Sequence, residues 1–139
     1  MTKPSLKLGF TDFFNPIDEF FTDVLSEDFD IIRDDQNPNY LIFCDENFGT
    51  NNLNYDESKV KKIFYTGENR RPWNYKAHHA ITFDHMDGPQ FFRLPLYSVE
   101  NWVNQKKLGW CDLRKFQRDR KSTRLNSSHT DISRMPSSA

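Results

Sequence analysis

The fold is decided by an apolar run that ends in a glycine and a carboxylate, Lys62-Ile63-Phe64-Tyr65-Thr66-Gly67-Glu68-Asn69-Arg70-Arg71-Pro72. An apolar run of this length bounded by glycine is typical of a strand in a parallel sheet that is covered on both faces. Open α/β sheets place their chemistry at the carboxyl ends of such strands. We therefore predict a strand over residues 60–66 and a candidate functional carboxylate at Glu68.

Further strands and helices are predicted on both sides of this run. Apolar stretches predict strands over residues 6–10, 30–33, 40–44, 80–83 and 91–97. Apolar residues recur at helical spacing from Ile17 to Leu25, after an expected N-cap at Asn15 with proline at the first helical position. A polar loop is expected over 45–54, and a last helix from Ser98. This alternation predicts an α/β fold with a Rossmann-like, mostly parallel sheet.

Length and composition fit one folded domain. The chain has 139 residues, of which 15% are aromatic, and this is enough for one core but not for two. Every aromatic residue lies at or before Phe116, and the sequence then turns polar and serine-rich. We predict a domain over residues 1–118 and a disordered, non-native tail over 119–139. From Lys121 onward this tail looks like translated sequencing-adapter or vector sequence.

Charge and motif content argue against several classes of function. The formal net charge is -1 and residues 1–118 contain no prominent basic run, so nucleic-acid binding lacks electrostatic support. The first strand continues into Gly9-Phe10-Thr11-Asp12, which is not a glycine-rich phosphate loop. We therefore expect no nucleotide site and no cofactor. Adjacent His78 and His79 point to opposite faces of a strand, so no metal site is expected.

The two cysteines and the hydropathy of the chain bear on its compartment. Cys44 and Cys111 lack zinc or redox spacing, and Cys44 is expected to be a buried strand thiol. A disulfide between them stays open, although a reduced protein is the simpler interpretation. No apolar run reaches membrane-spanning length, and the amino terminus lacks a signal-peptide core. For the chain as given we expect no membrane segment and a cytoplasmic location.

The motifs around Glu68 are similar to those of one enzyme family. Gly67-Glu68-Asn69 is followed in order by Pro72, Ile81-Thr82-Phe83-Asp84 and Arg93-Leu94-Pro95-Leu96-Tyr97. This set resembles the α-1,3-fucosyltransferases of glycosyltransferase family 10, over roughly residues 6–102. The resemblance implies a GT-B fold, of which this chain would be the N-terminal, acceptor-side half.

The resemblance also implies a reaction. Family members transfer L-fucose from GDP-fucose to a glycan acceptor that contains N-acetylglucosamine, with inversion and without a D-x-D metal site. GDP-fucose would be bound by a carboxy-terminal half that this chain lacks, so we expect the chain alone to be inactive. Anchored relatives would be membrane-associated or reside in the Golgi.

The candidate site residues follow from the resemblance and from their positions. The resemblance implies that Glu68 is the general base, and partial burial among aromatic side chains would raise its pKa toward the working pH. Asn69 serves equally well as a turn former, adjacent arginines usually form a solvated loop face, and aromatic residues more often pack in the core. With those alternatives open, the predicted acceptor-binding residues are Asn69, Arg70, Arg71, Trp73, Phe13 and Phe14.

A non-enzymatic function is the second hypothesis. A flavodoxin-like α/β module could bind a partner protein through the acids and aromatic residues at its strand ends. This hypothesis explains the alternating elements and the missing glycine-rich loop. It does not explain the ordered motif set.

Overall fold

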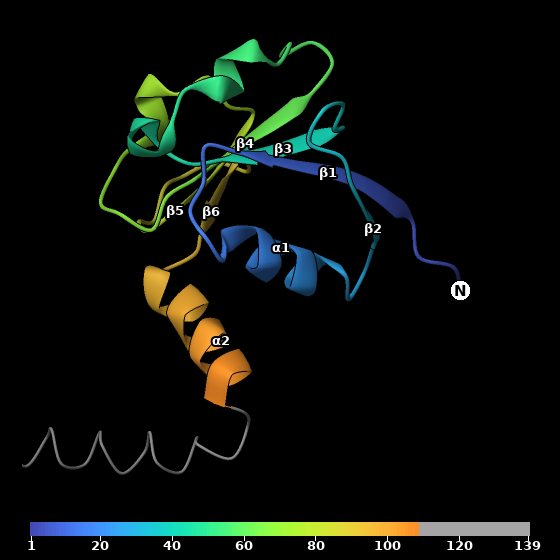
Figure 1. Cartoon of the computed structure of the whole chain (residues 1–139). Coiled ribbons are helices and arrows are strands. Elements are labelled where there is room, and N and C mark those ends of the chain that lie inside the picture. The colour runs from blue at the N-terminus through green and yellow to red at the C-terminus, as the bar shows by residue number, and fades with distance from the viewer. Residues whose placement is uncertain (109–139) are drawn as a thin grey trace, which may run out of the picture. The chain divides into compact units, whose positions relative to one another are not determined.

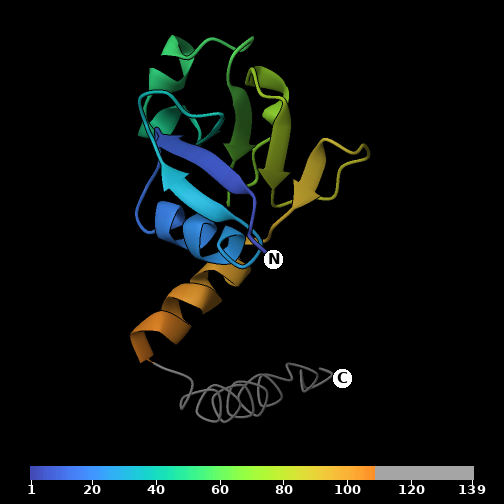
Figure 2. The same ribbon diagram turned by 90° about the vertical axis from the view of Figure 1, so that its right-hand side faces the viewer.

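The computed structural model describes residues 1–108, and its centre is a six-stranded sheet (Figure 1). The strands are β1 (Ser5–Thr11), β2 (Asp30–Arg33), β3 (Tyr40–Phe43), β4 (Lys61–Tyr65), β5 (His79–Thr82) and β6 (Phe91–Arg93). Their order is β2-β1-β3-β4-β5-β6, and each neighbouring pair is parallel. Figure 2 shows β6, in gold, at one edge of the sheet. The predicted α/β fold with a parallel sheet is confirmed.

Parallel pairing places the carboxyl ends of all six strands at the same edge of the sheet. Because every pair is parallel, the residues that follow the strands share one edge of the sheet, here named the C-terminal edge. The chain passes from β1 to β2 on one side and returns to β3 on the other, so the order reverses between β1 and β3. Ligands of open α/β sheets bind outside the carboxyl ends of strands near such a reversal.

One α-helix and the first turns of a second pack against one face of the sheet. Helix α1 (Ile17–Leu25) places Ile17, Phe20 and Phe21 in a core with apolar residues of β1, β3 and β4. Helix α2 (Leu96–Leu108) adds Val99 to that core, and the ring of Trp102 meets Phe20 edge to face at 5.5 Å. The apolar spacing that predicted α1 is therefore the stripe that the sheet buries.

The other face of the sheet is covered by loops with three short 3-10 helices. These are η1 (Glu46–Phe48), η2 (Asn51–Asn54) and η3 (Pro72–Asn74), and in Figure 1 they lie across the sheet from α1. A second core forms here from Phe43, Phe64 and Ala80. Tyr75 stacks on Phe64 with the two ring centroids 4.1 Å apart. The predicted polar loop 45–54 thus contains both η1 and η2.

Two expected boundaries are wrong. Helix α1 has Pro16 rather than Asn15 at its N-cap, because backbone carbonyls of Phe14 and Pro16 accept the first amide hydrogen bonds without a side-chain cap. The expected strand 91–97 ends at Arg93, and residues 96–97 begin α2 instead of strand. Pro95 explains this change, because its missing N–H cannot extend the ladder and its carbonyl accepts the amide of Ser98 at 2.9 Å.

The domain limits are only partly visible. One compact unit spans Met1–Val103. The expected limit at residue 118, the tail 119–139 and Cys111 lie outside the described residues. No helix in the described part of the chain is long and apolar enough to cross a membrane.

Tyr65 carries a buried hydroxyl that finds no hydrogen-bond partner among the described residues. Its side chain is fully buried, and burial raises the pKa of the hydroxyl. An unsatisfied buried polar group costs free energy. We therefore expect Tyr65→Phe to raise the free energy of unfolding by about 1 kcal/mol, as measured by urea denaturation of the 139-residue chain at neutral pH.

The pH dependence of this variant supplies a second measurement. A tyrosine in the unfolded chain ionises near about pH 10, whereas the buried hydroxyl of Tyr65 stays protonated to higher pH. Ionisation of Tyr65 therefore does not affect the free energy of unfolding below about pH 10. Above that pH only the unfolded chain ionises, so the folded protein loses stability as the pH rises. The advantage of Tyr65→Phe should widen above about pH 10. Tyr40→Phe, at an exposed tyrosine, is the control, and equal curves for both variants would contradict the prediction.

Candidate active site at the C-terminal edge

Glu68 stands on a tight turn at the end of β4. The amide of Glu68 donates to the Thr66 hydroxyl at 3.1 Å, and the amide of Arg70 donates to the Glu68 carbonyl at 2.8 Å. The Glu68 side chain is exposed, so the expected partial burial among aromatic residues is wrong. Within residues 1–108 its carboxylate makes no hydrogen bond or ion pair, and it is free to meet a ligand.

Gly67 explains why this turn points outward. A Cβ atom at Gly67 would lie 2.7 Å from Cδ1 and 3.2 Å from Cβ of Leu96, which is closer than such atoms pack. The glycine therefore lets the base of the turn lie against the start of α2. The tip of the turn, with Glu68 and the exposed Asn69, is left on the solvent side.

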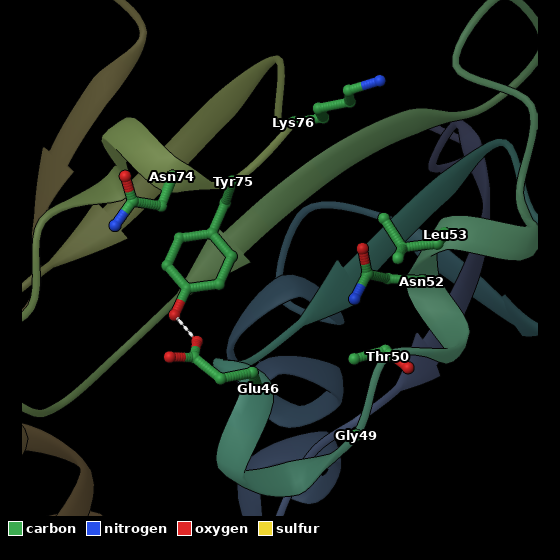
Figure 3. A pocket seen from close by; sticks show the side chains of 8 residues that line it. All are labelled: Glu46, Gly49, Thr50, Asn52, Leu53, Asn74, Tyr75 and Lys76. Atoms are coloured by element: carbon green, nitrogen blue, oxygen red, sulfur yellow. Dashed lines mark hydrogen bonds between the residues drawn. The ribbon is translucent and has the colours of Figure 1, made fainter.

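Arg70 ties this turn to the end of β3. Its guanidinium lies 3.0 Å from a carboxylate oxygen of Glu46 and 3.8 Å from one of Asp45. Asp45 is buried and also accepts the amide of Asn47 at 3.1 Å, which caps η1. The Tyr75 hydroxyl donates to the other oxygen of Glu46 (Figure 3), and this bond is the main cause that lowers the pKa of Glu46. Arg70 is therefore held in place and is not part of a freely solvated loop face.

Arg71 and Trp73 follow on the same loop. Arg71 pairs with Asp84, which follows β5, at 2.8 Å. Because both side chains are partly exposed, this ion pair contributes little to stability. It orients the Arg71 guanidinium toward the residues that follow β5. The Trp73 side chain is 68% exposed and touches Phe91 edge to face at 5.8 Å. Most of the Trp73 surface is thus open to solvent, and aromatic side chains of this kind can stack on a sugar ring.

Phe13 and Phe14 are half-buried rather than open. Phe13 packs beside Phe10 with centroids 5.8 Å apart, and Phe14 packs on Phe48 of η1 at 4.9 Å. Both rings also contact the core beneath α1. Their main contacts are therefore packing contacts, and a role in acceptor binding stays a prediction.

Asp12, which directly follows β1, organises the loop between β3 and β4. Its buried carboxylate accepts the backbone and side-chain N–H groups of Asn51 at 3.0 and 2.9 Å and those of Asn52 at 2.7 and 2.9 Å. Asp12 has a φ of 50°, in the left-handed region. A Cβ atom at Gly49 would lie 2.5 Å from Asp12 Oδ1, so only glycine fits there.

A hollow of about 330 Å³ lies between the β3–β4 loop and the loop that follows β4 (Figure 3). We name it the edge hollow. It is lined by Glu46, Gly49, Thr50, Asn52, Leu53, Asn74, Tyr75 and Lys76. None of the seven site residues predicted from sequence lines it, although Arg70 contacts Glu46 at its rim.

Metal and thiol chemistry find no support at this edge. Among the described residues no group of three or more histidine, cysteine or acidic side chains is placed to hold a metal ion. Burial raises the pKa of the Cys44 thiol to about 12, so it stays protonated at neutral pH and is a poor nucleophile. The carboxylate of Glu68 is an exposed ionisable group at the tip of the β4 turn.

Sequence reasoning missed several residues of this edge. Asp12 follows β1 directly, Asp45 follows β3 after one intervening residue, and Glu68 follows β4 after two. Their positions just after buried strands were a usable signal. Glu46 and Tyr75 carried no comparable signal. Their contact joins two loops that are 29 residues apart in the chain.

The parallel sheet, with acidic residues after its strands, defines an open α/β domain of the kind that binds ligands at the carboxyl ends of its strands. The model of the alpha-(1,3)-fucosyltransferase FucT N-terminal domain matches residues 8–100. The chain therefore belongs to the α-1,3-fucosyltransferase family, whose N-terminal domain it contains. None of the curated proteins compared with the chain matches it.

Solved structures share the fold. A crystal structure of an α1,3-fucosyltransferase aligns with a TM-score of 0.60 and 23% identity, over 76% of this chain and 32% of that one. A crystal structure of an α1,3-fucosyltransferase with GDP aligns with a TM-score of 0.50 and 25% identity, over 68% of this chain and 28% of that one. A crystal structure with GDP-fucose aligns with a TM-score of 0.57 and 22% identity, over 78% of this chain and 31% of that one. The chain thus spans about a third of the length of these enzymes.

Proposed function

We propose that this chain is the acceptor-binding half of an inverting α-1,3-fucosyltransferase and that Glu68 is its general base. The acceptor would be a glycan that contains N-acetylglucosamine. The single observation that carries the proposal is the free, exposed carboxylate of Glu68 on a fixed turn, in a chain whose family is known. The fold alone does not choose between hypotheses, because flavodoxin-like modules share the strand order 2-1-3-4-5. The family match favours the transferase over the interaction module.

The chemistry assigned to Glu68 is one proton transfer. The carboxylate accepts the proton of an acceptor hydroxyl while the hydroxyl oxygen attacks the anomeric carbon of fucose. The bond from that carbon to the GDP oxygen breaks on the opposite side, and GDP leaves with the bonding electron pair. An exposed carboxylate suits this role, because it must reach an acceptor that arrives from solvent.

The other predicted residues would hold the acceptor around Glu68. Asn69 offers an exposed amide beside it, and Trp73 offers an exposed aromatic side chain. Arg70 and Arg71 keep the loop in place through their ion pairs with residues that follow β3 and β5. Phe13 and Phe14 would shape the floor near β1.

Donor binding is assigned to the rest of the enzyme. The aligned structures are about three times as long as the matched part, and one of them is a structure with GDP-fucose. The turn after β1 carries Asp12 and Phe13 in place of a glycine-rich phosphate loop. We therefore expect no donor site in this chain.

We expect the purified 139-residue chain to transfer no fucose from GDP-fucose to N-acetyllactosamine, because a base without a bound donor has no electrophile to serve. The measurement is GDP release and product formation, followed over hours at high protein concentration. Steady turnover by the chain alone would contradict the assignment of donor binding to another half.

A further inference from the structure

Strand β6, at one edge of the sheet (Figure 2), is open to solvent on the side of the sheet that carries α1. Phe92 is the register partner of Ile81, and Ile81 packs against the core beneath α1, so both side chains lie on this side. Ile81 is partly buried, whereas Phe92 is 65% exposed. Within the described part of the chain, the cover that β1, β3 and β4 receive therefore stops short of β6.

The opposite side of β6 is covered. Phe91 is the register partner of Ala80 and packs with it in the second core. The ring of Trp73 contacts Phe91 edge to face at 5.8 Å. The amide of Leu94, just after β6, donates to the carbonyl of Thr82 at 2.8 Å, so the strand is regularly paired with β5. Strand β6 is thus an ordered part of the sheet that lacks cover on one side only.

The uncovered side of β6 is surrounded by exposed aromatic residues. Besides Phe92, Phe83 directly follows β5 and is 40% exposed, and Tyr97 in the first turn of α2 is 59% exposed. The carbonyl of Phe83 accepts the Nε–H of Arg93 at 3.2 Å, which ties the end of β5 to β6. We name Phe83, Phe92 and Tyr97 the β6 surface. Parallel sheets are normally covered on both faces, so an aromatic surface of this kind marks a place where another element packs.

The path of the chain indicates that this element does not come from a seventh strand beside β6. Helix α1 joins β1 to β2 on one side of the sheet, whereas the connections from β3 to β4 and from β4 to β5 run in the opposite direction on the other side (Figure 1). This is the pattern of right-handed crossovers, which nearly all parallel strands follow. Helix α2 begins on the α1 side, so a right-handed crossover through it would return to the position of β5. By this rule α2 leads out of the sheet.

The complete enzyme has enough polypeptide to cover the β6 surface. This chain spans about a third of the length of the aligned α1,3-fucosyltransferase structures. A second copy of the chain is a poorer occupant, because three partly exposed aromatic side chains of about 200 Å² each offer less than the roughly 800 Å² that each partner buries in a stable dimer. A segment of the same polypeptide is held close by its covalent connection and needs a smaller contact.

We propose that the β6 surface is an internal interface of the complete enzyme, covered by apolar side chains of the polypeptide that follows this domain. The inference rests on the family match and on the topology of the sheet. It does not depend on the role of Glu68, so either proposal can fail without the other. In the 139-residue chain the β6 surface is open to solvent.

The test compares thiol labelling of Tyr97→Cys by a maleimide in two proteins. One is the 139-residue chain, and the other is this chain completed with the donor-binding half of a family 10 fucosyltransferase. Both carry Cys111→Ser, and the native Cys44 reacts slowly because it is buried and its pKa is raised. We expect labelling to be slower by about tenfold or more in the completed enzyme, because thiol reactivity follows exposure. Ile32→Cys, at a half-exposed side chain of the opposite edge strand β2, is the control and should react equally in both.

A second substitution shows whether Phe92 holds the cover. Phe92→Asp should restore rapid labelling of Tyr97→Cys in the completed enzyme and lower its melting temperature, because a carboxylate cannot be buried against apolar side chains. The melting temperature of the 139-residue chain should not change, and Ile32→Asp should affect neither protein. Equal labelling of Tyr97→Cys in both proteins would overturn the inference, as would protection that Phe92→Asp does not relieve. Protection in the 139-residue chain that increases with protein concentration would indicate a second copy as the occupant and overturn it as well.

Discussion

Glu68→Gln should lower the turnover number by about a hundredfold or more in an enzyme in which this chain is completed with the donor-binding half of a family 10 fucosyltransferase. The amide keeps the shape of the side chain but cannot accept the proton of the acceptor hydroxyl. A loss of turnover in this variant can be attributed to the missing base, because Glu68 is exposed and within residues 1–108 its carboxylate holds no other group in place. The fold should therefore be unchanged.

The kinetic pattern distinguishes a base from a binding residue. Loss of the base should lower the turnover number and leave the Michaelis constant for GDP-fucose nearly constant, because the donor is held elsewhere. Glu27→Gln is the matched control, because Glu27 is exposed and remote from the C-terminal edge. Glu57 is less suitable, since its carboxylate lies 4.0 Å from the ammonium of the buried Lys62. Wild-type turnover in Glu68→Gln would return Glu68 to the role of an ordinary loop carboxylate.

Asp12→Ala should lower the free energy of unfolding by about 3 kcal/mol or more. The substitution removes the acceptor of four N–H groups from Asn51 and Asn52, two of them in a buried position. It also places a residue that disfavours positive φ at a backbone φ of 50°. The measurement is the midpoint of urea denaturation of the 139-residue chain.

Asp12→Asn separates the two causes. Asparagine tolerates the left-handed region, but its amide turns one acceptor oxygen into a donor that faces other N–H groups. We expect it to lose on the order of 2 kcal/mol, less than alanine does. Asp28→Asn is the control, because Asp28 is exposed and its side chain makes no hydrogen bond or ion pair among the described residues. An Asp12→Asn protein as stable as the wild type would show that the carboxylate network is not what holds the β3–β4 loop.

The sheet could be predicted because its information is local. Apolar runs such as 40–44 and 60–66 stand out from the polar turns around them, which are rich in aspartate, proline and asparagine. Each run forms a strand whose bounds lie within one or two residues of those expected. Helix α1 was equally clear from its apolar spacing. The strand predicted over residues 91–97 was too long, because apolar residues continue past Pro95 although the backbone there already belongs to α2.

The site was predictable only where a residue follows a strand. Thr66 and Gly67 separate Glu68 from the end of β4, and its place on the C-terminal edge followed from the parallel sheet alone. Its exposure did not, because burial depends on where Leu96 packs against Gly67. The network around Asp12 and the pairing of Glu46 with Arg70 join positions 24 to 40 residues apart. A single sequence holds no record of such pairings, so the edge hollow had no signal.

The most direct test of the central claim is the product that the completed enzyme forms. GDP-fucose and N-acetyllactosamine are incubated with that enzyme after donor binding and folding have been verified, and the product is analysed by NMR. The account predicts fucose in α linkage on the N-acetylglucosamine residue, formed by the wild type and by Glu27→Gln but nearly absent with Glu68→Gln. A folded, donor-bound enzyme that leaves N-acetyllactosamine unmodified, or that fucosylates it equally well without the Glu68 carboxylate, would contradict it.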